Sequence, residues 1–201
     1  MDTAATGPLP DAALDQLFRN ARTHNGFKPD PIPDADLRAI YELVKWAPTT
    51  ANSQPLRVLF IKSRAAKERL RAALSSGNRD KTMAAPATAI LAYDLEFYEK
   101  LPRTFAHNQE ARSWFAGQPA LIETTALRNS SIQGGYFIMA ARALGYDCGP
   151  MSGFDNAKVD AEFFPDRRIK SNFLCNLGHG EWSKVMPRNE RLTFDETCEI
   201  L

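Results

Sequence analysis

Apolar residues recur along this chain in two ways, at helical intervals in some segments and in short continuous runs in others. The helical intervals predict amphipathic helices, which span residues 11–20, 34–47, 65–74, about 121–143 and 158–163. The segment 121–143 is apolar on nearly all sides, which is typical of a helix in the core. The continuous runs predict buried strands at residues 58–61, 87–93 and 171–177.

The segments between these elements are rich in residues that favour turns. Residues 49–55, 75–78 and 147–154 read as loops, and Asp34 is expected to cap the helix that it begins. Residues 97–120 are aromatic and irregular, and they are a candidate mobile cover over a site. Helices outnumber strands and do not alternate regularly with them. This order predicts an α+β fold in a single domain over residues 1–201.

Composition and charge narrow the function classes. The chain has 201 residues, of which 44% are hydrophobic and 24% charged, and its formal net charge is +1. This balance gives no global attraction to nucleic acid or to an anionic membrane. No apolar run approaches the ~18 residues of a membrane span, and the first ten residues lack the pattern of a signal peptide. We therefore expect a cytoplasmic protein that binds neither nucleic acid nor membrane.

The cysteines and histidines do not predict a metal site. Cys148, Cys175 and Cys198 are far apart and form no CxxC pair, which also argues against a disulfide framework. The three histidines show no metal-binding spacing. The chain also lacks a GxGxxG fingerprint, a phosphate-binding GxxxxGK[ST] loop and a GxSxG elbow.

Four short segments offer polar chemistry, and each also has a plain structural reading. Arg22-Thr23-His24-Asn25 suits a phosphate, although such residues also occur in solvated loops. Residues 48–55 are dense in hydroxyls and amides that could orient a planar heterocycle, or could simply connect a helix to a strand. Asn78-Arg79-Asp80-Lys81 could fix a positive charge beside a ligand. Residues 149–154 could bring backbone close to a ligand or form a tight turn.

Taken together, these segments resemble the signatures of the FMN-dependent nitroreductase superfamily, over about residues 14–201. PTTANSQP at 48–55 is similar to its PSSxNSQP signature, NRDK at 78–81 to its NxxK element, and GPMSGF at 149–154 to its flavin loop. Further segments resemble the subgroup that contains the malonic semialdehyde reductase of pyrimidine degradation: ARTHNG at 21–26, SSGN at 75–78, ARSWF at 111–115, RNSS at 128–131 and DCGPMSGFD at 147–155.

The resemblance implies a central, mostly antiparallel sheet flanked by helices, in an intertwined homodimer with FMN at the interface. NADH or NADPH would donate electrons, and hydride would pass through flavin N5 in a ping-pong reaction. Lys81 would support the reduced ring electrostatically. The implied cofactor-binding residues are Arg22, Thr23, His24, Asn25, Pro48, Thr49, Thr50, Asn52, Asn78, Lys81, Ser152 and Gly153.

Ala21 and Asn25 stand where many family members carry basic residues, so Lys184 and Arg188 are further candidates for the FMN phosphate. The subgroup implies reduction of malonic semialdehyde to 3-hydroxypropanoate. Arg103 and Arg112 are then candidates for the substrate carboxylate, and the proton could come from His24, His107 or water. Three alternatives stay open: a broad nitroaromatic or quinone reductase, a non-redox flavin-binding protein, and an interaction module without a cofactor.

Overall fold

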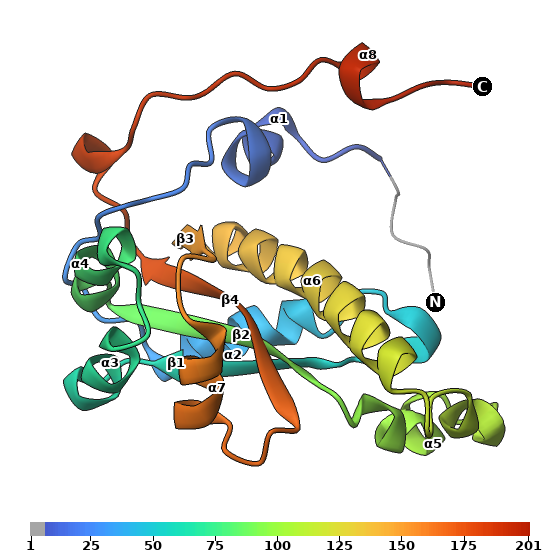
Figure 1. Ribbon diagram of the computed structural model, residues 1–201. Coiled ribbons are helices and arrows are strands. Elements are labelled where there is room, and N and C mark those ends of the chain that lie inside the picture. The colour runs from blue at the N-terminus through green and yellow to red at the C-terminus, as the bar shows by residue number, and fades with distance from the viewer. Residues whose placement is uncertain (1–6) are drawn as a thin grey trace.

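A four-stranded antiparallel sheet forms the centre of the protein, in a computed structural model that describes residues 7–201 (Figure 1). Residues 1–6, which include part of the segment predicted to lack a signal peptide, lie outside the described residues. The strand order is β1-β2-β4-β3, with β1 at Leu56–Ile61, β2 at Ala87–Asp94, β4 at Ile169–Gly178 and β3 at Asp147–Met151. The predicted α+β class and antiparallel sheet are confirmed.

Helices flank the sheet. The longer ones are α2 (Asp34–Val44), α3 (Arg64–Arg71), α4 (Ser76–Ala84), α6 (Pro119–Ala143) and α7 (Asn156–Phe163). The short ones are α1 (Asp11–Leu14), its π-helical continuation η1 (Asp15–Arg19), η2 (Thr50–Asn52), η3 (Phe97–Lys100), α5 (Leu101–Thr104), η4 (Gln109–Trp114), η5 (Trp182–Lys184) and α8 (Phe194–Thr197). Asp34 is the first residue of α2 rather than its cap, and its carboxylate pairs with Lys62 at 2.5 Å.

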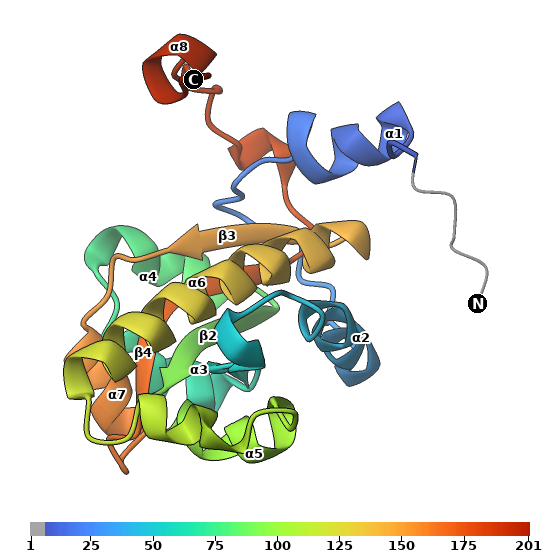
Figure 2. The same cartoon turned by 90° about the vertical axis from the view of Figure 1, so that its right-hand side faces the viewer.

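The long helix α6 lies across the sheet, as its apolar composition predicts (Figure 2). It approaches closely at Gly134, where a Cβ would lie 2.6 Å from the ring of Phe173 on β4. Phe137 and Ala141 of α6 are buried in the same cluster as Leu91 of β2. This packing supports the central strands, whose continuous apolar runs are buried on both faces.

Strand β3 was predicted as a loop, because Gly149 and Pro150 both disfavour strands. It lies at the edge of the sheet, where a proline that cannot donate is tolerated. Gly149 allows a close crossing by another segment, since a Cβ there would lie 2.6 Å from the carbonyl oxygen of His24. The backbone N–H of His24 donates to the carbonyl of Cys148 at 3.0 Å. Contacts with distant segments therefore hold β3 as a strand, although its own residues favour a turn.

Helix α4 was also missed, because Ser75-Ser76-Gly77-Asn78 reads as a turn. Its C-terminal end is held by Lys67 of α3, whose ammonium donates to the carbonyls of Thr82, at 2.9 Å, and Ala85. Lys67 is 3% exposed, and burial lowers its pKa to about 8. A buried ammonium thus satisfies carbonyls that a helix end leaves open.

Residues 97–120 form η3, α5 and η4 in place of the irregular excursion that was expected. The segment has a small core of its own, in which Phe97, Leu101, Ala111 and Phe115 are buried. The two termini lie away from the sheet and near one another along part of their length (Figures 1 and 2). The C-terminal segment 186–201 is exposed throughout.

Candidate active site

One group of predicted site residues gathers where α4 meets the end of β3. The carbonyl of Gly153 accepts three hydrogen bonds, from Ser75 Oγ at 2.7 Å, Asn78 Nδ2 at 2.9 Å and the Ser75 N–H at 3.1 Å. A Cβ at Gly153 would lie 2.4 Å from Asn78 Nδ2. The residue must therefore be glycine for this loop to dock on α4. The exposed Ser152 lies directly beside it.

Lys81 joins the same group from the next turn of α4. Its Nζ donates to Asn25 Oδ1 at 3.2 Å, and partial burial lowers its pKa. Asn25 belongs to a segment that runs beside β3, where Thr23 bridges to Cys148. The structure thus brings together three of the predicted motifs, which come from the N-terminal segment, α4 and the loop after β3.

The C-terminal candidates lie next to this segment. Arg22 donates to the carbonyl of Met186, and Arg188 donates to the carbonyls of Arg19, at 2.8 Å, and Ala21. The two guanidinium groups therefore lie along the same crossing of the N-terminal and C-terminal segments. Lys184 pairs with Glu181 at 3.0 Å, and its side chain packs over Gly26. Arg22, Lys184 and Arg188 thus provide positive charge of the kind that binds a phosphate.

His24 is buried beside this group. Its ring packs edge-on against Trp182, with centroids 5.1 Å apart. Nε2 lies 3.2 Å from Asp147 Oδ1, in poor geometry for a hydrogen bond. Gly180 makes room for the ring, since a Cβ there would lie 1.9 Å from Nδ1. Cofactor contact and proton donation by His24 stay predictions. His107 is exposed.

The second group of predicted residues lies in the loop between α2 and β1. Ala51, Asn52 and Gln54 all have left-handed backbone, with φ of 49°, 48° and 45°. Such conformations cost energy in residues other than glycine and cluster at functional sites. The loop begins at Pro48 and is fastened at Thr49, whose hydroxyl accepts the Gln54 N–H at 3.2 Å.

Further contacts tie this loop to α5 and α6. Asn52 Nδ2 donates to the carbonyl of Thr104 at 2.7 Å, and the Thr50 N–H donates to Asn129 Oδ1 at 2.8 Å. Gln133, one turn along α6, accepts the Leu56 N–H at 3.0 Å. Asn129 and Gln133 were not predicted to contact this loop. Their spacing of four residues on an otherwise apolar helix is the signal that could have identified them.

The two arginines predicted to bind a substrate carboxylate differ in their surroundings. Arg112 makes a two-fold contact with Glu99, with both N···O distances at 2.7 Å. Glu99 is the main cause of the raised pKa of Arg112. This carboxylate occupies the guanidinium fork in the structure, and substrate binding by Arg112 stays a prediction. Arg103, on α5, is exposed and makes no ion pair with any residue of 7–201.

The two groups lie at opposite ends of the molecule. Figure 1 shows α4 at one end and α5 at the other, and they remain apart in the turned view of Figure 2. The register explains this separation, since α4 leads into β2 at Ala87 while Tyr93, near the other end of β2, pairs with Leu56 after the loop. Eight residues of strand span roughly 25 Å. One chain therefore does not bring both groups to a single flavin ring.

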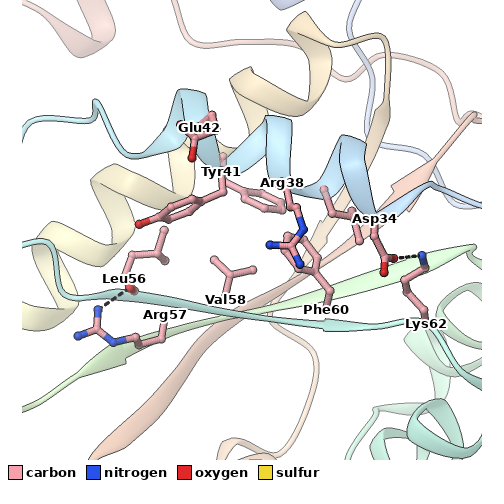
Figure 3. Close-up of a pocket in the computed structure, with 11 residues that line it drawn as sticks. Asp34, Arg38, Tyr41, Glu42, Leu56, Arg57, Val58, Phe60 and Lys62 are labelled. Carbon is pink, nitrogen blue, oxygen red and sulfur yellow. Dashed lines mark hydrogen bonds and ion pairs between the residues drawn. The ribbon is translucent and has the colours of Figure 1, made fainter.

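A cavity of about 880 Å³ opens between α2 and the edge strand β1 (Figure 3). Tyr41 of α2 and Val58 and Phe60 of β1 line it, with Phe137 of α6 beneath. Charged residues such as Arg38 and Glu42 form its rim. None of the candidate site residues of either group lines this cavity. Its apolar floor is better suited to apolar side chains of another polypeptide segment than to a cofactor.

Among residues 7–201, no three His, Cys, Asp or Glu side chains are grouped so as to hold a metal ion. No helix in this part of the chain has the length and apolar character needed to cross a membrane.

The chain matches the Nitroreductase family over residues 18–179. It is 56% identical to a protein of Ralstonia nicotianae provisionally named NADH dehydrogenase/NAD(P)H nitroreductase, across 96% of this chain and 98% of that one. A provisionally named nitroreductase of Bacillus subtilis, ydfN, has the same fold, with a TM-score of 0.86 at 22% identity over 96% of this chain and 100% of that chain.

Another solved structure, a provisionally named nitroreductase from Exiguobacterium sibiricum, contains FMN. It has a TM-score of 0.83 at 16% identity over 99% of this chain and 100% of that chain. The protein described here belongs to the nitroreductase family. This confirms the family resemblance and the nitroreductase-like fold predicted from the sequence.

Proposed function

We propose that this protein is an FMN-dependent NAD(P)H oxidoreductase that works as a homodimer. The observation that carries the proposal is the division of the candidate site between the two ends of the sheet. A twofold dimer can bring the α4 end of one chain to the loop 48–55 of its partner. Each of two equivalent sites would then be complete, and the flavin would lie at the interface.

The α4 end fits the cofactor in charge and shape. Arg22 and Arg188 supply two guanidinium groups for a phosphate, with Thr23 beside them and Lys184 nearby. Asn78 and Lys81 supply donors for the polar edge of a ring, and Gly153 keeps the backbone close. Bound FMN would supply the two-electron redox chemistry. Lys81 would hold a positive charge beside the ring, where it favours the anionic reduced form.

Exposed apolar surfaces support the dimer. Phe194, Ile200 and Leu201 in the C-terminal segment are between 57% and fully exposed, and Figure 1 shows this segment away from the sheet. The cavity between α2 and β1 offers an open strand edge and an apolar lining for the same segment of a second copy. The partner's tail is the occupant that we propose for it.

The finer proposal concerns the substrate. We infer that the enzyme reduces malonic semialdehyde to 3-hydroxypropanoate, with Arg103 near the carboxylate. The sequence segments that resemble the semialdehyde reductase subgroup support this choice, as does the absence of an ion pair between Arg103 and any residue of 7–201. The second candidate is a broad nitroaromatic or quinone reductase, which the name of the Ralstonia relative favours. A cytoplasmic location stays a prediction.

Anaerobic stopped-flow reduction tests the proposal. The purified protein, loaded with FMN, is mixed with NADH or NADPH while flavin absorbance is followed. We expect bleaching, and then faster reoxidation by malonic semialdehyde than by nitrofurazone. Reoxidation by the nitro compound alone would favour the second candidate. A protein whose flavin is not bleached would be a non-redox flavin protein, and a protein that cannot bind FMN would contradict the proposal itself.

A further inference from the structure

A smaller cavity lies at the loop end of the molecule, next to the groove of Figure 3, with which it shares Tyr41, Leu56 and Arg57. Its volume is about 180 Å³, which is room for several water molecules at about 30 Å³ each. Walls come from α2, from the loop before β1 and from α5, with α6 at the base. The lining residues are Tyr41, Lys45, Ser53, Gln54, Leu56, Arg57, Lys100, Arg103, Thr104 and Gln133.

The charge of this lining is one-sided. Four of the lining residues are cationic and none is a carboxylate. Two of these cations are neutralised from outside the cavity, Lys45 by Glu42 and Arg57 by the buried Asp94 at 2.5 Å. Lys100 and Arg103 make no ion pair with any residue of 7–201. Glu99 lies next to Lys100 in the chain, but its carboxylate is held by Arg112.

The cavity also contains polar capacity that the described chain does not use. Ser53 is 1% exposed, and its Oγ has no hydrogen-bond partner among residues 7–201. A buried hydroxyl without a partner is unfavourable, because it has given up its hydrogen bonds to water. The neighbouring residues Asn52 and Gln54 hold left-handed backbone, which places Ser53 in a strained turn. The unpaired hydroxyl and the strained backbone therefore lie in the same wall of the cavity.

We propose that this cavity binds an oxyanion, the carboxylate or phosphoryl group of a small ligand. Arg103 and Lys100 would pair with its charge, and the Ser53 hydroxyl, whose oxygen is closed to solvent in this structure, would turn toward the cavity to donate to one of its oxygens. The loop 48–55 forms one wall, so the oxyanion would lie beside the face that the proposed function gives to the partner's flavin. The inference rests on that function for its role in the reaction, but the binding itself does not.

Two ligands of the proposed enzyme carry such a group. One is the carboxylate of a semialdehyde acid, and the other is a phosphate of the dinucleotide donor. Both are oxyanions that a guanidinium binds in a two-fold contact. The same cavity can therefore explain either substrate choice or donor choice, and the experiment has to separate them.

Direct titration with inorganic phosphate tests binding without turnover. The FMN-loaded protein is used, so that the site of the cofactor phosphate is filled, and binding is followed by calorimetry and ³¹P NMR. We expect Arg103→Gln to weaken phosphate binding about tenfold or more, as loss of a charge-assisted contact does. Arg64→Gln, an equal loss of charge on the remote and exposed surface of α3, is the control and should bind as the wild type does.

Ser53→Ala gives an independent check. If the hydroxyl serves the oxyanion, this variant binds phosphate several-fold more weakly and yet unfolds at a higher temperature in phosphate-free buffer, because a buried polar atom without a partner is gone. The proposal is overturned if the wild type binds no phosphate, if Arg103→Gln binds it as tightly as the wild type, or if Arg64→Gln loses as much.

Steady-state ratios then identify the source of the oxyanion. In Arg103→Gln, a rise in the KM for 4-nitrobenzoate relative to 4-nitrobenzamide assigns the cavity to the substrate carboxylate. A rise in the KM for NADPH relative to NADH assigns it to the nucleotide phosphate. If neither ratio changes, the cavity has no role in the reaction. A protein that binds phosphate but reduces nothing would contradict the proposed function alone.

Discussion

The two ends of the sheet differ in how their backbone is held. At the α4 end, the loop after β3 is tied by hydrogen bonds: Gly153 accepts three of them, and Lys67 holds the end of α4. At the loop end, three residues are held in left-handed backbone. Buried polar atoms without a partner among residues 7–201 occur at both ends, in Ser53 at the loop and in Arg79 and the His24 ring near α4. Backbone strain, rather than unpaired polar atoms, therefore distinguishes the loop end.

The largest expected effect comes from two variants, one blocked at the α4 end and the other at the loop end. Ser152 and Thr50 are exposed at opposite ends, so Ser152→Trp and Thr50→Trp should each abolish FMN binding without disturbing the fold. If each site draws one end from each chain, a mixed dimer has one clean site and one doubly blocked site. Refolding the two variants together should then restore about a quarter of the wild-type sites.

Flavin fluorescence and activity measure this recovery. Refolding Ser152→Trp with Lys81→Met, both altered at the α4 end, is the matched control and should restore nothing. Equal recovery in both mixtures, or none in either, would show that the two ends do not serve a common site across chains.

A smaller effect is expected from adding a methyl group at the α4 end, where the loop after β3 contacts α4. Gly153→Ala places a methyl group 2.4 Å from Asn78 Nδ2, so the loop must move away from α4. We expect a loss of about 1–3 kcal/mol in the free energy of unfolding and a weaker affinity for FMN. Urea unfolding of the flavin-free protein and a flavin titration measure the two quantities.

Gly77→Ala is the control for this variant. Gly77 lies in the same helix with open space around it, so alanine there should stabilise the protein by about 0.5–1 kcal/mol through helix propensity. Loss of stability in both variants alike would mean that the contact between Gly153 and α4 does not matter.

The smallest expected effect tests the backbone strain in the loop 48–55. Ala51 has φ 49°, which costs an alanine about 1–2 kcal/mol, while glycine loses about 0.5–1 kcal/mol through the entropy of the unfolded chain. Ala51→Gly should therefore raise the free energy of unfolding by about 0.5 kcal/mol and weaken FMN binding slightly. Ala161→Gly, in helix α7, should instead lower it by about 1 kcal/mol. If Ala51→Gly is the more destabilising of the two, the loop is not strained.

Local pattern predicts some of this molecule well and other parts poorly. The helix predicted over about 121–143 and the strand predicted over 87–93 are present at 119–143 and 87–94, because burial on several sides leaves a continuous apolar signal. Strand β3 and helix α4 were missed because their residues favour turns. Their structure depends on other segments: β4 and the His24 backbone for β3, and Lys67 for α4. Short-range periodicity carries no information about such contacts.

The candidate site shows the same limit. Motif resemblance located Asn78, Lys81 and the loop 48–55 in the sequence, but it could not show that Asn78 is tied to Gly153 or that Arg112 is held by Glu99. The cationic cavity combines residues of α2 and the loop that follows it with residues of α5, which lies much further along the chain, and no motif describes it. Ser53 looked like one more hydroxyl in a polar loop, and its lack of a partner is visible only in three dimensions.

Under the dimer proposal, the exposed tail after Met186 ties the fate of this protein to its abundance. A newly made chain would carry Leu192, Phe194, Ile200 and Leu201 in water until another copy covered them. The active fraction would fall with dilution, since pairing follows mass action. Scarce chains would remain open to proteases along a segment with no core to protect it, whereas abundant chains would shield one another. A cell could therefore clear surplus unpaired enzyme without any dedicated degradation signal.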